Sequence, residues 1–281
     1  MSGMLYLCAT PIGNLEDMSY RAIRTLQEVD LIAAEDTRNS IKLLNHFEIK
    51  TPMTSYHEFN KYDKADYLVQ KLNEGMNIAV ITDAGTPGIS DPGEELVKKA
   101  LEAGIKVTTI PGPAAFVNAL IISGKSSRRF VFEAFLPSDK KERQKVLQSF
   151  KDETRTIIMY EAPHRLKKTL VELQVVLGNR NISLCKELTK RHENVFSTTI
   201  EEALAYYQEN DPKGEFVLII EGRPQEDLEE ESIRKWDKVS LNEHMKIYLD
   251  KGMTKKEAMK AVAADRGVSK RDVYQWLLEE E

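Results

Sequence analysis

The chain has 281 residues, with 40 Lys and Arg against 45 Asp and Glu, and so a formal net charge of −5. Its 41% hydrophobic and 30% charged residues are typical of a folded globular protein and exclude the disordered and collagen-like classes. At about 150 residues per domain, this length predicts two domains with their own cores. The small negative charge argues against a chain coated with basic residues, although it permits a local basic face.

The two cysteines, Cys8 and Cys185, lie far apart in the sequence, each in an apolar run. Neither has the neighbouring cysteine or histidine that zinc sites use, so we expect buried free thiols and no metal site. The longest mostly apolar stretch, residues 114–122, is far shorter than the roughly 20 residues that span a bilayer. No cationic residue precedes Arg21, so a secretory n-region is missing. These features predict a cytoplasmic protein without a membrane partner.

The first half of the chain alternates short runs rich in Val and Ile with stretches of helical period. We predict strands over residues 4–9, 31–34, 78–82 and 106–110, and helices over residues 20–28, 61–74 and 94–103. Gly75 and Gly104 each follow a helix and precede a strand, as glycines that end helices do. This alternation predicts an α/β domain with a mainly parallel sheet, which we place at residues 1–137.

A second α/β domain is predicted over residues 138–223. An apolar run ends at Pro137 and a charged helix is expected from Lys140 onward. Strands over 156–160, 182–185 and 216–220 then alternate with helices over 165–177 and 200–208, which predicts a mainly parallel or mixed sheet. Residues 225–231 contain five acids after Pro224, so residues 224–232 are predicted to be an acidic, solvated linker.

The tail, residues 233–281, has no strand pattern and is predicted to form two or three helices. Between Lys251 and Asp272 it carries seven basic residues against three acids. Helices over 255–264 and 270–278, joined by a turn with Ser269 as N-cap, resemble a helix-turn-helix that binds nucleic acid. The same pattern is equally compatible with a helical hairpin that packs only on itself.

Three loops that follow predicted strands are crowded with Gly and Pro: residues 10–14 (TPIGN), 83–93 (DAGTPGISDPG) and 111–115 (PGPAA). In parallel α/β domains, ligands bind beyond the carboxyl ends of the strands. Glycine lets the backbone approach a ligand, and proline stiffens the loop. A tight turn would explain one such loop, whereas three of them predict a rigid main-chain cradle. The missing G-x-G-x-x-G and G-x-x-x-x-G-K-[ST] patterns disfavour dinucleotides and P-loop nucleotides.

These loops, together with EDTR (35–38), HEFN (57–60) and YEAPHR (160–165), resemble the tetrapyrrole-methylase superfamily over essentially the whole chain. More narrowly, they resemble its branch of ribosomal RNA methyltransferases, which modify the 2′-oxygen of a cytidine ribose in 16S RNA of the small subunit. The resemblance implies two α/β domains, S-adenosylmethionine in the cleft between them, and a homodimer. It implies cofactor contacts at Pro11, Asp83, Gly85, Thr86, Ile89, Ala114, Ala115, Tyr160, Leu184 and Gly214. Many members carry Ser-Ala where this chain has Ala114 and Ala115. A hydroxyl contact at position 114 is therefore missing from this chain.

Transfer of a methyl group to a ribose hydroxyl is helped by a general base within hydrogen-bond reach. The carboxylates near strand ends are Glu35, Asp36, Glu161 and Glu187. An ion pair with a neighbouring arginine is the alternative role for each of them. Asp36 and Glu187 are our candidate catalytic residues.

Ribosomal RNA would need cations and aromatic rings around the mouth of the cleft. Arg38, Lys186 and Arg191 are candidates for phosphate contacts. His57 and Phe59 are candidates for hydrogen bonding to and stacking on an extruded base, and a core contact is the alternative for Phe59. The sequence thus favours methylation of ribosomal RNA within the assembled small subunit. The two alternatives are methylation of a tetrapyrrole or other small molecule, and non-catalytic RNA binding.

Overall fold

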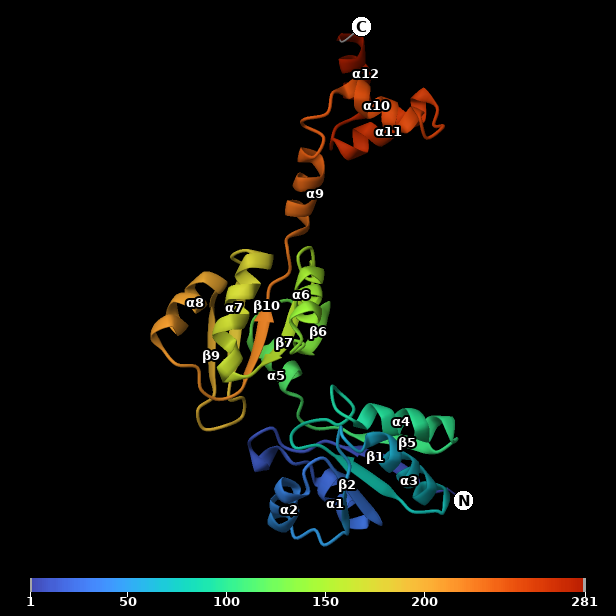
Figure 1. Ribbon diagram of the computed structural model, residues 1–281, viewed down its shortest axis with the longest axis vertical. Helices are drawn as coiled ribbons and strands as arrows, with labels where there is room; N and C mark the ends of the chain where they lie inside the picture. The colour runs from blue at the N-terminus through green and yellow to red at the C-terminus, as the bar shows by residue number, and fades with distance from the viewer. Residues whose placement is uncertain (1, 280–281) are drawn as a thin grey trace. The chain divides into compact units, whose positions relative to one another are not determined.

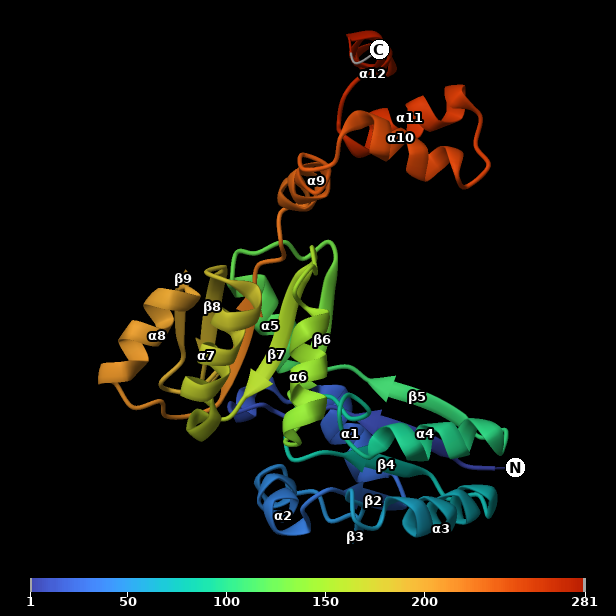
Figure 2. The ribbon, with the colours of Figure 1, turned by 45° about the horizontal axis from the view of Figure 1, so that its top comes forward.

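The structure is a computed structural model that describes residues 2–279. The chain divides into two compact units. Unit 1 comprises Met1–Gln148 and Thr156–Glu221, and unit 2 comprises Ser149–Arg155 and Gly222–Glu281. Figure 1 and Figure 2 show the elements of each unit in two orientations.

Unit 1 begins with a parallel sheet whose strand order is β3-β2-β4-β1-β5. Its strands are β1 (Met4–Cys8), β2 (Leu31–Ala34), β3 (Met53–Ser55), β4 (Ile78–Ile81) and β5 (Lys106–Ile110). The helical segments that connect them are η1 (Leu15–Asp17), α1 (Tyr20–Glu28), α2 (Thr37–His46), α3 (Lys61–Asn73) and α4 (Gly93–Glu102). Because all five strands are parallel, the loops that follow them lie at one edge of the sheet.

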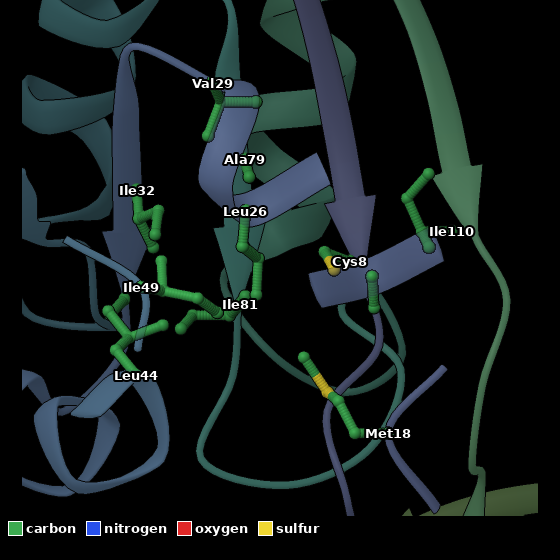
Figure 3. Close-up of a cluster of buried hydrophobic side chains, with 12 residues drawn as sticks. Cys8, Met18, Leu26, Val29, Ile32, Leu44, Ile49, Ala79, Ile81 and Ile110 are labelled. Carbon is green, nitrogen blue, oxygen red and sulfur yellow. The ribbon is translucent and has the colours of Figure 1, made fainter. Parts of the chain in front are cut away.

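Both faces of this sheet are covered by helices, which explains the nearly continuous apolar strands. On one face, strand residues such as Ile32 and Ile81 pack against Leu26 of α1 and Leu44 of α2 (Figure 3). Successive strand residues point to opposite faces. Accordingly, Leu5, Ala33 and Val80 pack on the other face against the buried side chains Leu68 of α3 and Leu96 of α4.

The second sheet of unit 1 is mixed, with the order β6-β7-β10-β8-β9. Its strands are β6 (Phe130–Phe135), β7 (Thr156–Glu161), β8 (Asn181–Lys186), β9 (Asn194–Thr199) and β10 (Phe216–Ile220). Strands β6 and β7 are parallel, and the other neighbours are antiparallel. Helix α5 (Ala115–Ile122) lies on one face, opposite α6 (Lys140–Ser149), α7 (Pro163–Leu177) and α8 (Ile200–Glu209) (Figure 2). The predicted fold class, α/β with parallel and mixed sheets and a helical tail, is confirmed.

Strand β6 precedes the expected domain boundary at residue 137 in the sequence, but it belongs to the second sheet. Its backbone pairs with β7, from Phe130 opposite Thr156 to Phe135 opposite Tyr160, so it belongs to the second sheet. The change in pattern at Pro137 marks the end of a strand and the start of the charged helix α6, and not a change of sheet. The division of unit 1 into separate domains stays a prediction.

In unit 2, the predicted acidic linker is helical. Helix α9 (Gln225–Arg234) is largely exposed, and an ion pair between Arg234 and Glu230, four residues apart, stabilises it. The segment predicted as an acidic, solvated linker is therefore an exposed helix.

The remaining helices of unit 2 are α10 (Leu241–Leu249), α11 (Lys255–Asp265) and α12 (Lys270–Glu279). They share a small core that includes Met245, Val262 and Val273. Ser269 caps α12 as predicted, because its hydroxyl accepts a hydrogen bond of 3.2 Å from the Asp272 amide. Among residues 2–279, no helix is both long and apolar enough to cross a membrane.

Candidate functional site

The three loops rich in Gly and Pro are joined into one cradle at the edge of the first sheet. The Thr10 amide donates to the Gly85 carbonyl at 2.9 Å, and the Gly85 amide donates to the Thr10 carbonyl at 3.0 Å. The Thr86 hydroxyl donates to the Pro113 carbonyl at 3.0 Å. The predicted main-chain cradle is therefore present, and hydrogen bonds fix its loops relative to one another.

The Asp91 carboxylate fixes the longest of these loops from within. It accepts hydrogen bonds from the amides of Gly88 at 2.8 Å, Ile89 at 3.2 Å and Gly93 at 2.7 Å. Gly85 has φ of +86°, in the left-handed region that favours glycine. The loop is thus held in its binding shape by its own contacts, which lowers the ordering cost of binding.

The cradle forms one wall of a cavity of about 610 Å³ within unit 1. This volume lies within the roughly 300–1,000 Å³ that small-molecule sites occupy. The first sheet and its loops contribute Ile12, Glu35, Thr82, Asp83, Ala84, Gly85, Thr86, Ile89, Ser90 and Asp91. The opposite wall comes from α5 and the second sheet: Ala114, Ala115, Phe116, Phe135, Tyr160, Glu161, Ala162, Pro163, His164, Cys185, Leu188, Lys190, Glu215, Phe216 and Val217.

Most of the predicted cofactor contacts line this cavity: Asp83, Gly85, Thr86, Ile89, Ala114, Ala115 and Tyr160. Pro11, Leu184 and Gly214 do not, but the next residue in each case does, namely Ile12, Cys185 and Glu215. Leu184 is only 1% exposed, and alternation along β8 directs Cys185 to the cavity face. Contact of these residues with a cofactor stays a prediction.

The lining suits a ligand with a flat ring and a positive centre. Phe116, Phe132, Phe135 and Tyr160 form an aromatic cluster, in which the ring centroids of Phe135 and Tyr160 are 5.5 Å apart. Glu35, Asp83, Asp91, Glu161 and Glu215 are among the residues that line the same cavity, together with Lys190. The adenine ring and the sulfonium of S-adenosylmethionine match an aromatic wall and a surplus of negative charge.

Asp36 does not line the cavity, whereas its neighbour Glu35 does. Asp36 is the N-cap of α2, and its carboxylate accepts from the Arg38 amide at 2.8 Å and from the Arg38 guanidinium at 2.9 Å. These hydrogen bonds with Arg38 lower the pKa of Asp36 to about 2. The catalytic role of Asp36 stays a prediction, and its contacts are those of a capping residue paired with an exposed arginine.

Glu187 fastens the loop after β8 to the start of β10. Its Oε1 accepts from the Glu215 amide at 2.9 Å and from Lys190 Nζ at 3.1 Å. Burial acts to raise the pKa of Glu187, but the Glu215 amide and Lys190 outweigh it and leave that pKa below its ordinary value. A Cβ on Gly214, where φ is +82°, would lie 2.5 Å from Glu187 Cγ. Gly214 therefore leaves space for the Glu187 side chain. The catalytic role of Glu187 stays a prediction.

Glu35 is held differently from these two acids. Burial raises its pKa above the ordinary value, and the charges of Asp83 and Asp91 act in the same direction. Burial also raises the pKa of Asp83. Glu35 was among the sequence candidates because it directly follows a strand, but no feature of the sequence favours it over Asp36.

The candidate RNA contacts lie at the surface or near it. Phe59 is 98% exposed, so it is not a core residue, and its ring centroid lies 6.1 Å from that of the half-buried His57. Arg38 and Arg191 are exposed. Lys186 lines a second cavity, of about 480 Å³, together with Phe196, Tyr206 and Lys213. Their contact with RNA stays a prediction.

The sequence analysis did not identify Phe116, Phe135 or Lys190 as cavity residues. Phe116 lies in the first turn of an apolar helix and Phe135 at the end of a strand of the other sheet. Nothing in their local pattern distinguishes them from core residues, because only the folded chain brings them opposite the cradle. Lys190 follows β8 and was visible as a cation after a strand.

Comparisons with known proteins agree with this geometry. The family model described as Tetrapyrrole (Corrin/Porphyrin) Methylases matches residues 4–204. The chain is 52% identical over 272 residues to the Ribosomal RNA small subunit methyltransferase I of Halalkalibacterium halodurans, which covers 97% of this chain and 93% of the relative. It is 50% identical over 278 residues to the protein of the same name from Synechocystis, covering 99% of this chain and 98% of the relative.

Among solved structures, uroporphyrin-III-C-methyltransferase from Thermus thermophilus superposes with a TM-score of 0.56 at 17% sequence identity. The superposition covers 78% of this chain and 94% of that protein, and it shows a shared fold. Members of the family use S-adenosylmethionine as methyl donor. From the family match and the identity to these relatives over nearly the whole chain, we conclude that the chain belongs to the tetrapyrrole methylase family.

Proposed function

We propose that this protein transfers the methyl group of S-adenosylmethionine to small-subunit ribosomal RNA, at the 2′-oxygen of a cytidine ribose, in the cytoplasm. The observation that carries the proposal is the extent of the similarity to the relatives named Ribosomal RNA small subunit methyltransferase I. They match 97–99% of the chain, including most of the helical tail, whereas the family model ends at residue 204.

The cavity supports the cofactor part of this proposal. S-adenosylmethionine supplies a methyl group on a positively charged sulfur, which an attacking oxygen displaces in line. The backbone amides and carbonyls of the cradle bind its polar ends, and the aromatic cluster binds its ring. A cavity of fixed shape then holds the attacking oxygen about 3–3.5 Å from the methyl carbon, which by itself removes much of the barrier.

The surface residues support the RNA part. Phe59 offers an exposed ring on which an extruded base stacks, with His57 beside it. Arg38, Lys186 and Arg191 contribute phosphate contacts, which orient the RNA without reading its sequence. The segment 251–272 of unit 2, with its excess of basic residues, fits an RNA partner better than a tetrapyrrole. The similarity to the solved uroporphyrin-III-C-methyltransferase is one of fold alone.

We further propose that the protein acts as a homodimer, as the family resemblance implies. Helix α5 exposes Val117, Ile121 and Ile122, of which Ile121 is 68% exposed. Exposed apolar side chains on neighbouring turns are typical of protein interfaces. Sedimentation of the purified protein should give twice the 32.1 kDa mass of the chain.

The proposed function is tested by supplying tritiated S-adenosylmethionine and small ribosomal subunits from cells that lack this gene. We expect tritium in the small-subunit RNA, in a nucleotide whose 3′ phosphodiester resists alkali because its 2′-oxygen is methylated. Protein-free RNA and uroporphyrinogen serve as alternative acceptors. Labelling of the tetrapyrrole alone, or of a base in place of a ribose, would contradict the proposal.

A further inference from the structure

We propose that Glu35 is the catalytic residue that accepts the proton of the ribose hydroxyl as that oxygen is methylated. This inference rests on the proposed function and adds to it the residue that carries the proton.

Glu35 lies at the edge of the first sheet that faces the cavity. It directly follows Ala34, the last residue of β2, which is paired with Ser55 of β3 on one side and Ile81 of β4 on the other. The parallel register brings His57, which follows β3, and Asp83, which follows β4, to the same edge. Glu35 and Asp83 both line the cavity beside the glycine-rich loop.

The other carboxylates of the cavity are engaged in holding the structure together. Asp91 accepts from three loop amides, and Glu215 pairs with Lys190 at 2.8 Å. Glu161 is fully buried, pairs with Arg165 at 3.4 Å and accepts a hydrogen bond from the Thr169 hydroxyl. Each of these carboxylates is thus already engaged in a structural contact.

Asp83 and Glu35 remain. Burial raises the pKa of both, but Asp83 is exposed whereas Glu35 is half-buried, and their contacts differ. The Asp83 carboxylate is held by the Asn39 side chain and the Asp36 backbone, and the charge of Arg38 favours its ionised form. Glu35 is held by the backbone of Asp83, while burial and the charges of Asp83 and Asp91 disfavour its ionised form. A partly buried carboxylate with a raised pKa binds a proton more readily than an exposed one and is the better base.

His57 opposes this shift, because its charge lowers the pKa of Glu35. The groups that face Glu35 are thus Asp83 and Asp91 from the loop after β4 and His57 from the loop after β3. Together they leave the pKa of Glu35 raised, so protonation of Glu35 as the pH falls removes the base. Activity should therefore decline toward acid pH through the pKa of Glu35.

In the methyl transfer, Glu35 is the only protein group that changes its protonation state. The ribose oxygen forms a bond to the methyl carbon, the carbon–sulfur bond breaks, and its electron pair stays on sulfur. The hydroxyl proton moves to the Glu35 carboxylate, which later releases it to solvent. The products are the 2′-O-methyl ether, the neutral thioether S-adenosylhomocysteine and a proton.

The test compares Glu35→Gln and Glu35→Ala with the wild type and with Glu102→Gln, which changes an exposed acid of α4 outside the cavity. Single-turnover methylation of small subunits should fall about 10²- to 10⁴-fold in both Glu35 variants and stay unchanged in Glu102→Gln. Formate should restore part of the activity of Glu35→Ala. Calorimetry with S-adenosylhomocysteine should show retained binding in all variants.

A second readout does not depend on turnover. Carbon-13 NMR of the labelled side-chain carboxyls should show two glutamates with a raised pKa in the wild-type protein, Glu35 and Glu133, and the signal of only one of them should be missing in Glu35→Gln. Active wild-type protein together with equally active Glu35 variants would overturn the role of Glu35 and leave the proposed function standing. Wild-type protein that methylates no small subunit would overturn the proposed function, and the role of Glu35 with it.

Discussion

Single residues of the cradle explain why its loops need their particular amino acids. Gly85 combines a φ of +86° with a place on the cavity wall, and a Cβ there would lie 3.3 Å from Ile12 Cγ2. Gly112 is confined for a different reason, since its Cβ would lie 2.8 Å from that of Ala9. These glycines let the backbone pass close to neighbouring residues, and Gly85 also lines the cavity.

Gly85→Val should abolish cofactor binding, because its side chain occupies space at the cavity wall. A matched control is Gly104→Val, which has a similar φ of +71° but nothing within 4 Å of the added Cβ. Both variants lose about 1–2 kcal/mol of stability from backbone strain, so circular dichroism should show similar melting shifts. Ala115→Trp should also abolish binding by filling the opposite wall.

Calorimetry with S-adenosylhomocysteine separates the two glycine variants. Gly104→Val should bind like the wild type, whereas Gly85→Val should show no binding heat. Unchanged affinity in both Gly85→Val and Ala115→Trp would mean that the cofactor binds elsewhere.

Asp36→Asn tests whether the first candidate base is a structural residue. Asparagine caps helices as well as aspartate, so the melting temperature should stay close to that of the wild type. If Asp36 serves only as cap and partner of Arg38, the methylation rate should change by less than about threefold. A loss of about 10²- to 10⁴-fold would restore Asp36 as the base and contradict the role of Glu35. Glu187→Gln serves as the same test for the second candidate.

The site residues show how far sequence reasoning extends at this scale. The glycine- and proline-rich loops were visible as motifs, and the structure confirms that they form one cradle. The choice among neighbouring acids was not visible, because Glu35 and Asp36 are adjacent in sequence and differ only in which way their side chains point. The hydrogen bonds that the Asp36 carboxylate accepts from Arg38 orient its side chain, and they form only in the folded chain.

At the scale of elements, the strands and helices with strong apolar periodicity were predicted well. Strands β2, β5 and β10 and helix α1 have the predicted bounds. Several elements were missed, namely η1, α2, β3, α5, β6, β9 and α9, and among these β3 and β9 have weaker patterns. Strand β3 has only three residues, all half-buried, and β9 is an edge strand rich in Asn, Ser and Thr. Partly buried strands show little alternation of apolar and polar residues, so the sequence pattern does not reveal them.

Helix α10 carries a pH-sensitive group, His244, whose side chain is fully buried. Its ring stacks on Trp236 with centroids 3.6 Å apart, and its nitrogens contact Asp265 at 2.9 Å and Arg266 at 3.2 Å. Burial lowers the pKa of His244 and outweighs the opposing effect of Asp265. The folded state therefore holds this histidine neutral at a pH where the unfolded chain already protonates it.

Unit 2 should accordingly lose stability as the pH falls below about 6.5, the ordinary pKa of histidine, and should show no contribution from His244 above it. His244 is the only histidine of this unit, and both tryptophans of the chain, Trp236 and Trp276, also belong to it. Tryptophan fluorescence in urea therefore follows this unit selectively. A midpoint that is the same at about pH 7.5 and pH 5.5 would contradict a depressed pKa.

At the scale of the whole molecule, composition and charge predicted the separation of an α/β part from a cationic helical tail. They did not predict that both sheets would belong to one compact unit, because that depends on contacts between segments far apart in sequence. The segment 251–272 also uses some of its seven basic residues internally. Arg266 donates to the Val239 carbonyl and to His244 Nδ1, and Lys251 Nζ lies 5.1 Å from the centroid of the Tyr248 ring.

Truncation after Gly222 tests the tail as an RNA-binding arm. Cofactor affinity should be unchanged, because no residue that lines the cavity lies beyond Val217. Affinity for the small subunit should fall, and its salt dependence should flatten as phosphate contacts are lost. Binding measured at two salt concentrations gives both quantities. Unchanged affinity and salt slope would show that the tail is not an RNA arm, and a collapsed fold would make it a structural element.

The most direct measurement of the central claim is a map of ribose methylation in small-subunit ribosomal RNA from cells that lack the gene. Complementation with the wild-type gene should restore one 2′-O-methylcytidine that the deletion lacks, and complementation with Gly85→Val should not. Identical ribose methylation with and without the gene, or a restored methyl group on a base, would contradict the assignment of this chain as a ribose methyltransferase of small-subunit RNA.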